Sequence, residues 1–278
     1  MRSRPFVQMD VFTAEPYLGN PVAVVLDAEG VTDDQMAAFA RWTNLSETTF
    51  VLPPTTPDAD YRLRIFTPGG ELPFAGHPTL GSASAWLGTG ATPRTPGTVV
   101  QECGVGLVRL RRDGDRLAFA APPLIRSGPA DAATRTLVSR SLRIPDDEIR
   151  DCAWVDNGPG WVAALLADGD AVLALEPDLP AMGTLHVGVV GLWGPGHDAD
   201  AEVRAFVPGI GIPEDPVTGS LNASLGQWLI PAGVLPEQYV VAQGTVLQRA
   251  GRVHVQRVGE DVWVGGDTVT CIAGEVRL

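Results

Sequence analysis

The stretch His-Pro-Thr-Leu-Gly-Ser at residues 77–82 returns half a chain later as Asp-Pro-Val-Thr-Gly-Ser at residues 215–220. Both copies keep Pro, Gly and Ser in place, at an offset of 215 − 77 = 138 in a chain of 278 residues. Arg-Ile-Phe-Thr-Pro-Gly at 64–69 and Arg-Ala-Phe-Val-Pro-Gly at 204–209 repeat at an offset of 140. One repeat at half the length indicates two similar halves rather than an array of short repeats.

The repeat predicts that each half presents one titratable residue, His77 or Asp215, at the same structural point. A simpler interpretation is that both halves need the same strand-to-helix turn, which would explain the recurring Pro and Gly. That interpretation does not account for titratable residues at matching positions. We therefore expect the two turns to serve one function.

Helix signals flank the first copy. The small residues at 81–85 predict a helix around which other elements can pack tightly, as in the middle of a curved sheet. An earlier helix is expected to open at Thr32 with acidic residues in its first turn and to end near Asn44. Its apolar residues at helical spacing are Met36, Phe39, Ala40 and Trp42.

Composition narrows the possible partners and cofactors. The net charge of −13 disfavours binding to nucleic acid or to anionic membranes. All 20 basic residues are Arg, so a Schiff-base lysine, a pyridoxal-phosphate anchor and a P-loop lysine are excluded. The three Cys and four His lack metal-ligand spacing, so no metal is expected. No apolar run approaches the length of a membrane span and no signal peptide is seen, so we expect a cytoplasmic protein.

Several residues could carry chemistry. The N–H groups at the two helix starts could bind an anion, and Gly76, Gly81 and Gly219 would let a ligand approach the backbone. Ser82 and Ser220 either cap a helix or bind the ligand. By itself, Glu47 in its polar loop would be a solvated surface group, and Cys103 on a predicted strand is interpreted as a small buried hydrophobe.

Four motifs occur in an order that resembles the PhzF-type phenazine-biosynthesis isomerases. They are Asp-Val-Phe-Thr with Gly-Asn-Pro-Val-Ala-Val at 10–13 and 19–24, Asn-Leu-Ser-Glu-Thr-Thr-Phe at 44–50, Phe-Ala-Gly-His-Pro-Thr at 74–79, and Glu-Asp-Pro-Val-Thr-Gly-Ser at 214–220. The resemblance implies an α+β, diaminopimelate-epimerase-like fold of two pseudo-symmetric halves. Each half would be a curved mixed sheet wrapped round a central helix, with the active site between the halves.

The resemblance also implies boundaries, roles and a reaction. We expect an N-terminal half of residues 1–124, joined by the C-terminal strand 268–278, and a C-terminal half of residues 125–267. The acid/base residue would be Glu47, while His77 and Asp215 would hold and polarise the substrate with help from Gly76, Gly219 and Ser220. The implied reaction is the cofactor-free isomerisation of trans-2,3-dihydro-3-hydroxyanthranilate, a small carboxylic acid, in secondary metabolism by a homodimer.

Other functions stay open at this point. The substrate could be an alkylproline-type precursor, or the enzyme could be a racemase or epimerase with Glu47 and either His77 or Asp215 as two bases. A non-catalytic protein that binds a small acid is a third alternative. Relatives named after epimerases use two facing Cys, and neither turn of this chain carries one, so a two-thiol racemase is not expected.

Overall fold

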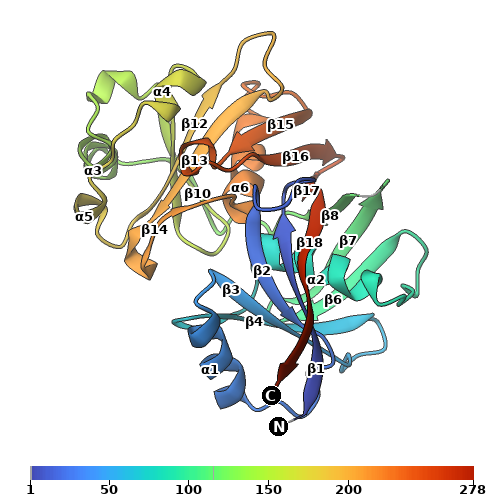
Figure 1. Cartoon of the computed structure of the whole chain (residues 1–278). Coiled ribbons are helices and arrows are strands. Elements are labelled where there is room, and N and C mark those ends of the chain that lie inside the picture. Colours follow the sequence, from blue (N-terminus) through green and yellow to red (C-terminus); the bar gives the residue numbers. More distant parts are fainter. Residues whose placement is uncertain (1, 115) are drawn as a thin grey trace. The chain divides into compact units, whose positions relative to one another are not determined.

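The computed structural model describes residues 2–114 and 116–278. The chain divides into two compact units (Figure 1). Unit 1 comprises Met1–Ala120 and Gly265–Leu278, and unit 2 comprises Ala121–Val264. The last strand of the chain therefore belongs to the same unit as the first, with which it pairs along its whole length. Among the described residues, none of the helices has both the length and the hydropathy of a membrane span.

Unit 1 is a mixed sheet with two helices. Its strands are β1 (Ser3–Val11), β2 (Asn20–Val25), β3 (Glu47–Leu52), β4 (Tyr61–Thr67), β5 (Gly70–Leu72), β6 (Thr98–Cys103), β7 (Gly106–Asp113), β8 (Arg116–Ala120) and β18 (Thr268–Arg277). The helices are α1 (Asp33–Thr43) and α2 (Gly76–Gly88). β2 pairs with β3, and β4 with β6, in parallel, whereas β1 pairs with both β2 and β18 antiparallel.

Helix α2 is the centre of unit 1. It packs against β1, β2, β3 and β8, and its residues 76–83 are all buried. A Cβ atom at Gly81 would lie 2.5 Å from Cγ1 of Val22, so a larger residue there would clash with β2. The hydroxyls of Ser82 and Thr49 lie 2.8 Å apart and link α2 to β3. The small residues thus allow the close packing that the sequence predicts.

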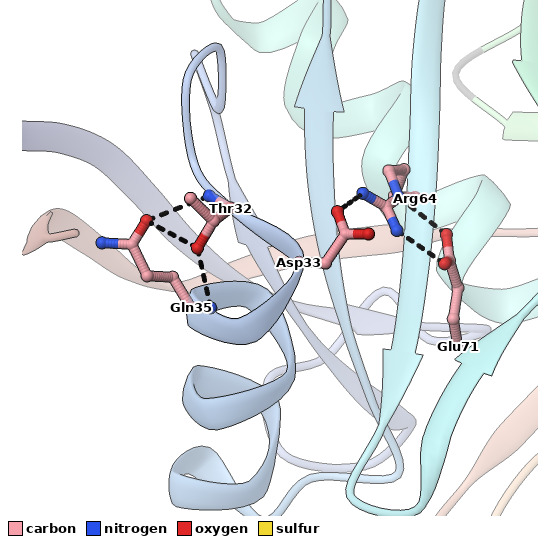
Figure 2. A network of polar contacts seen from close by, with 5 residues as sticks. All are labelled: Thr32, Asp33, Gln35, Arg64 and Glu71. Carbon is pink, nitrogen blue, oxygen red and sulfur yellow. Dashed lines mark hydrogen bonds and ion pairs between the residues drawn. The ribbon is translucent and has the colours of Figure 1, made fainter.

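Helix α1 begins and ends where its sequence signals predict. The Thr32 hydroxyl accepts from the backbone N–H of Gln35, whose side chain accepts from the backbone N–H of Thr32 (Figure 2). Asn44 closes the helix in the left-handed conformation. The predicted apolar stripe is wrong at Trp42, which is 80% exposed. Trp42 comes six residues after the buried Met36, which places it about 240° round the helix from that residue.

Unit 2 is also a mixed sheet with a central helix. Its strands are β9 (Arg126–Pro129), β10 (Asp151–Asp156), β11 (Trp161–Leu165), β12 (His186–Leu192), β13 (Ala201–Val207), β14 (Ile212–Asp215), β15 (Gln238–Gln243) and β16 (Gly251–Val258), while β17 (Asp261–Gly266) crosses the unit boundary. The helices are α3 (Ala132–Leu142), α4 (Gly169–Leu173), α5 (Leu179–Met182), α6 (Gly219–Leu229) and the 3₁₀ turns η1 (Asp146–Glu148), η2 (Pro208–Ile210) and η3 (Thr245–Leu247). The buried α6 packs against β10 and β16. The predicted α+β class, with a mixed sheet round a central helix in each half, is confirmed.

Corresponding strands of the two units pair in the same way. In unit 1 Val22 pairs with Glu47, Thr48 with Phe66 and Ile65 with Leu72, and in unit 2 Trp161 pairs with His186, Val187 with Phe206 and Ala205 with Asp215. Corresponding residues therefore differ by 139 or 140 up to β13. Beyond β13 the difference is 215 − 72 = 143, because the turn at η2 is two residues longer than its counterpart in unit 1 and a bulge in the β13–β14 pairing adds one more residue.

This register corrects one expectation. Helices α2 and α6 start at Gly76 and Gly219, which again differ by 143, so the structural counterpart of His77 is Ser220. His77 lies in the first turn of α2, whereas Asp215 is the last residue of β14, at the position of Leu72. The expectation that His77 and Asp215 occupy the same structural point is therefore wrong. The repeated Pro and Gly match in sequence at an offset of 138, five residues short of the structural offset of 143, so they do not mark equivalent positions of the fold.

An ion pair supports the corrected register. In unit 1 Arg64 donates from Nε and Nη2 to the two carboxylate oxygens of Glu71, as drawn in Figure 2. In unit 2 Arg204 donates from the same two nitrogens to the two oxygens of Glu214. The arginines differ by 140 and the glutamates by 143, which agrees with the strand pairing.

Candidate active site

Glu47 and His77 meet in unit 1. Glu47 is the first residue of β3, three residues after Asn44 ends α1, and His77 is the second residue of α2. Oε2 of Glu47 lies 3.2 Å from Nε2 of His77, with the two side chains 13% and 6% exposed. The interpretation of Glu47 as a solvated surface group is therefore wrong. The helix end and the strand start hold this carboxylate against the imidazole.

Burial controls the protonation of His77. Desolvation lowers the pKa of the imidazole to about 3, and a hydrogen bond to the backbone carbonyl of Pro21 raises the pKa only partly. Because Nε2 faces Glu47, the nitrogen that donates to Pro21 is Nδ1. His77 is thus neutral near pH 7, with its proton on Nδ1 and an unprotonated Nε2 that lies 3.2 Å from Oε2 of Glu47 without a hydrogen bond between the two atoms.

The turn that leads into β2, where Pro21 lies, is itself fixed. The backbone N–H of Gly19 donates to Oδ2 of the buried Asp10 at 3.0 Å. A Cβ atom at Gly19 would lie 2.2 Å from the carbonyl oxygen of Val11, so only glycine fits at this position. Asp10 and Gly19 therefore help to position the carbonyl that selects the tautomer of His77.

In unit 2, Asp215 ends β14 just before α6. The Thr218 hydroxyl donates to Oδ2 of Asp215 at 2.6 Å, and Thr218 is the N-cap residue of α6. Asp215 and Glu214 are neighbours, so the strand places one carboxylate on Arg204 and the next on Thr218. Asp215 is half-buried.

Gln243 organises this turn, and nothing in the sequence pattern singles it out. Its amide N–H groups donate to the Asp215 carbonyl at 3.1 Å and to the Thr218 hydroxyl at 2.9 Å. Its carbonyl accepts from the backbone N–H of Thr218 at 3.0 Å and from Asn222 at 2.9 Å. Gln243 is 1% exposed, so its four hydrogen bonds rigidly link β15 to the start of α6. A glutamine at the end of a strand has no sequence signature.

The capping interpretation of the two serines is wrong. The N-cap residues are Ala75 and Thr218, which leaves Gly76 and Gly219 as the first residues of α2 and α6. Ser82 contacts Thr49 in the core. Ser220 is the second residue of α6, its hydroxyl accepts from Nε1 of Trp161 at 3.1 Å, and its carbonyl accepts from Asn157 at 3.0 Å.

His186 is the counterpart of Glu47 at the start of β12, as the strand pairing shows. The imidazole is half-buried and hydrogen-bonds to the backbone carbonyl of Pro159. Desolvation lowers its pKa. Its ring centroid lies 5.5 Å from that of Trp161. Sequence reasoning missed His186 because the only signal is the pairing register, which requires the structure.

The thiols of Cys103 and Cys152 are not activated. Cys103 ends β6, is half-buried rather than fully buried, and its pKa is raised by desolvation. Burial also raises the pKa of Cys152, to about 11. Both side chains are therefore thiols near pH 7. Among residues 2–114 and 116–278, no group of three or more His, Cys, Asp or Glu is arranged to hold a metal ion.

The chain is similar to known proteins over nearly its whole length. Residues 9–274 match the PhzC-PhzF family, described as "Phenazine biosynthesis-like protein". "Antisense-enhancing sequence 1" of Schizosaccharomyces pombe is 36% identical over 99% of both chains. "Trans-2,3-dihydro-3-hydroxyanthranilate isomerase" of Pseudomonas aeruginosa is 34% identical over 91% of this chain and 90% of the relative. A PhzF-family crystal structure from Enterococcus faecalis superposes with a TM-score of 0.82, 25% identity and full coverage of both chains. The chain therefore belongs to the PhzC-PhzF family of phenazine biosynthesis-like proteins, and its relatives place it among isomerases.

Proposed function

We propose that this protein moves a proton on a small unsaturated cyclic carboxylic acid without a cofactor, as in the isomerisation of trans-2,3-dihydro-3-hydroxyanthranilate. The proposal depends above all on the contact between Glu47 and the neutral His77. It is also supported by the name of the Pseudomonas aeruginosa relative. Glu47 would take a carbon-bound proton from one atom of the substrate and return it to another.

The contact supports an acid/base role for a physical reason. An imidazolium 3.2 Å from the carboxylate would hold Glu47 in its ionised form, whereas the neutral His77 leaves the carboxylate able to bind a proton. The carboxylate of Glu47 can then take the proton from one substrate carbon and return the same proton to another, so the group acts as base and then as acid.

Four further residues are proposed to bind the substrate. In this proposal Asp215 and Ser220 supply a carboxylate and a hydroxyl, and Gly76 and Gly219 let the substrate approach the two helix starts. The first N–H groups of a helix have no acceptor within that helix, so they suit the carboxylate of the substrate. Positioning a substrate in this way can lower the barrier by about 7 kcal/mol at best.

The absence of Lys supports chemistry without a Schiff base or pyridoxal phosphate. The resemblance also supports a cytoplasmic homodimer in secondary metabolism, which light scattering and the neighbouring genes can test. Of the alternatives, an alkylproline-type substrate keeps the same roles for Glu47 and His77. A racemase or epimerase would invert a stereocentre, and a binding protein would show no turnover.

Proton NMR of trans-2,3-dihydro-3-hydroxyanthranilate mixed with the protein, in H₂O and in D₂O, tests the proposal. We expect the signals of an isomer to replace those of the substrate, with the migrating hydrogen partly retained in D₂O because Glu47 is shielded from solvent. Cyclic imino acids are run in parallel, and deuterium uptake with loss of optical activity would indicate a racemase. Binding of both kinds of acid without any change in their spectra would refute catalysis.

A further inference from the structure

Ser220 has a partner that fixes the direction of its hydroxyl. Nε1 of Trp161 donates to Oγ of Ser220 at 3.1 Å. Trp161 opens β11 and is 2% exposed, whereas Ser220 is half-buried at the start of α6. The indole N–H is a donor only, so in this contact the serine oxygen must accept. The proton of the Ser220 hydroxyl is therefore left for another acceptor.

Within the described part of the chain, the Ser220 hydroxyl makes no hydrogen bond other than the one from Trp161. The backbone around it is fixed, because Asn157 donates to the Ser220 carbonyl at 3.0 Å. The carbonyl and the hydroxyl oxygen are thus both held, while the hydroxyl proton has no acceptor. A polar group in this state is suited to a ligand that carries a negative oxygen.

The pseudo-symmetry of the units supports the same conclusion. Ser220 stands where unit 1 has His77, as the second residue of the central helix. Both residues are fixed by a polar contact with a strand: Glu47 of β3 contacts His77, and Trp161 of β11 contacts Ser220. Trp161 pairs with His186 in the way that Val22 pairs with Glu47. Trp161 therefore occupies in unit 2 the position of Val22 in unit 1, and its indole N–H makes a hydrogen bond that valine cannot make.

We propose that Trp161 is a positioning residue for substrate binding: its indole N–H holds Ser220 so that the serine hydroxyl donates to the carboxylate of the substrate. This inference rests on the proposed function, in which Ser220 contacts the substrate. His186 supports the indole from one side, since its ring lies against that of Trp161. Trp161 itself need not touch the substrate.

A double-mutant cycle tests the proposal with trans-2,3-dihydro-3-hydroxyanthranilate as substrate. Trp161→Phe keeps an aromatic ring and removes the N–H. We expect KM to rise about 3- to 10-fold, the usual effect of one hydrogen bond, with kcat within about twofold of the wild type. Ser220→Ala should raise KM at least as much. Trp161→Phe made in the Ser220→Ala background should then have no further effect, because the two residues act through one hydroxyl.

Trp154→Phe is the matched control. Trp154 lies on the neighbouring strand β10, and its buried Nε1 has no hydrogen-bond partner among the described residues. Its replacement should leave KM unchanged. A normal KM in Trp161→Phe beside a raised KM in Ser220→Ala would overturn the inference and leave the proposed function standing. Additive effects in the cycle would also overturn it, because they would mean that Trp161 acts only through packing.

An NMR measurement needs no activity and no stable Trp161 variant. The seven tryptophans give seven indole N–H signals in protein labelled with ¹⁵N-tryptophan. Ser220→Ala should shift one of them upfield, since the indole loses its acceptor, and Trp154→Phe should remove a different one. An indole spectrum that Ser220→Ala leaves unchanged would show that the hydrogen bond is not formed, and the inference would fail.

Discussion

Oε2 of Glu47 and Nε2 of His77 lie 3.2 Å apart, although one side chain comes from the first residue of a strand and the other from the first turn of a helix. The Pro21 carbonyl holds the proton of His77 on the far nitrogen, so the nitrogen near the carboxyl group carries no proton. The pair thus places a carboxyl group that can exchange a proton with the substrate beside a buried, neutral imidazole. The first two predictions test this relationship.

Glu47→Gln should abolish turnover while the variant still folds and binds. The amide keeps the shape and the hydrogen bonding of the side chain but cannot take a proton from carbon. We expect kcat on trans-2,3-dihydro-3-hydroxyanthranilate to fall by at least about 10²-fold, with little change in affinity. Steady-state kinetics and calorimetric titration measure the two quantities. Glu29→Gln, at an exposed position of the same unit, is the control. Turnover of Glu47→Gln within about threefold of the wild type would contradict the acid/base role.

His77 should make the protein less stable at mildly acidic pH. The unfolded imidazole binds a proton below its ordinary pKa of 6.5, whereas the folded one stays neutral down to about 3. Stability is therefore lost as the pH falls through this range, by at most about 1.4 kcal/mol per pH unit from this group. Between about pH 7 and about pH 5 the loss is about 2 kcal/mol.

Urea unfolding of the wild type and of His77→Gln at these two pH values isolates that loss. Glutamine does not titrate, so the decrease in unfolding free energy should be smaller in the variant by about 2 kcal/mol. The test compares how much the unfolding free energy of each protein decreases between the two pH values. A destabilisation of the variant that is the same at both pH values therefore does not affect the result. Equal decreases in the two proteins would mean that His77 titrates normally and is solvated.

The role of Asp215 in substrate binding can be tested separately from its hydrogen bond to Thr218. Asp215→Ala and Thr218→Val both break the 2.6 Å hydrogen bond between the two side chains, but only the first removes the carboxylate. If Asp215 binds the substrate, Asp215→Ala should lower kcat/KM by about 10- to 100-fold and Thr218→Val by much less. Similar thermal stabilities of the two variants would show that the comparison is fair. Equal losses of activity in the two variants would mean that Asp215 only stabilises the turn before α6 and does not bind the substrate.

Local signals in the sequence predicted where helices begin and end. They could not predict which residues of distant strands come together, because that depends on long-range strand pairing. Thr32 and Asn44 mark both ends of α1 because capping is local chemistry. The register of the repeat was wrong because Pro78 lies inside the first turn of α2, whereas Pro216 precedes the N-cap residue of α6. Proline is tolerated in both places, so the motif does not fix the start of the helix. Gln243 and Trp161 reach α6 from strands far along the chain, which no local pattern reveals.

The two equivalent ion pairs allow a comparison of burial within one protein. Arg204 and Glu214 have side chains 4% and 9% exposed, whereas Arg64 and Glu71 are 16% and 41% exposed. Arg204 also donates to the carbonyls of Val172 and Leu175, so it ties α4 to β13. Arg204→Met leaves Glu214 buried without its counter-ion, and we expect the unfolding free energy to fall by about 3 to 5 kcal/mol. Arg64→Met should change it by no more than about 1 kcal/mol, because water screens Glu71.

Urea unfolding of the two variants measures the difference, and Arg204→Met combined with Glu214→Leu is the informative control. Removal of both charges should recover part of the loss, since the penalty in the single variant comes mainly from an isolated buried carboxylate. A single variant Arg204→Met as stable as Arg64→Met would mean that water reaches Glu214, and the assignment of this pair to the core of unit 2 would then be wrong.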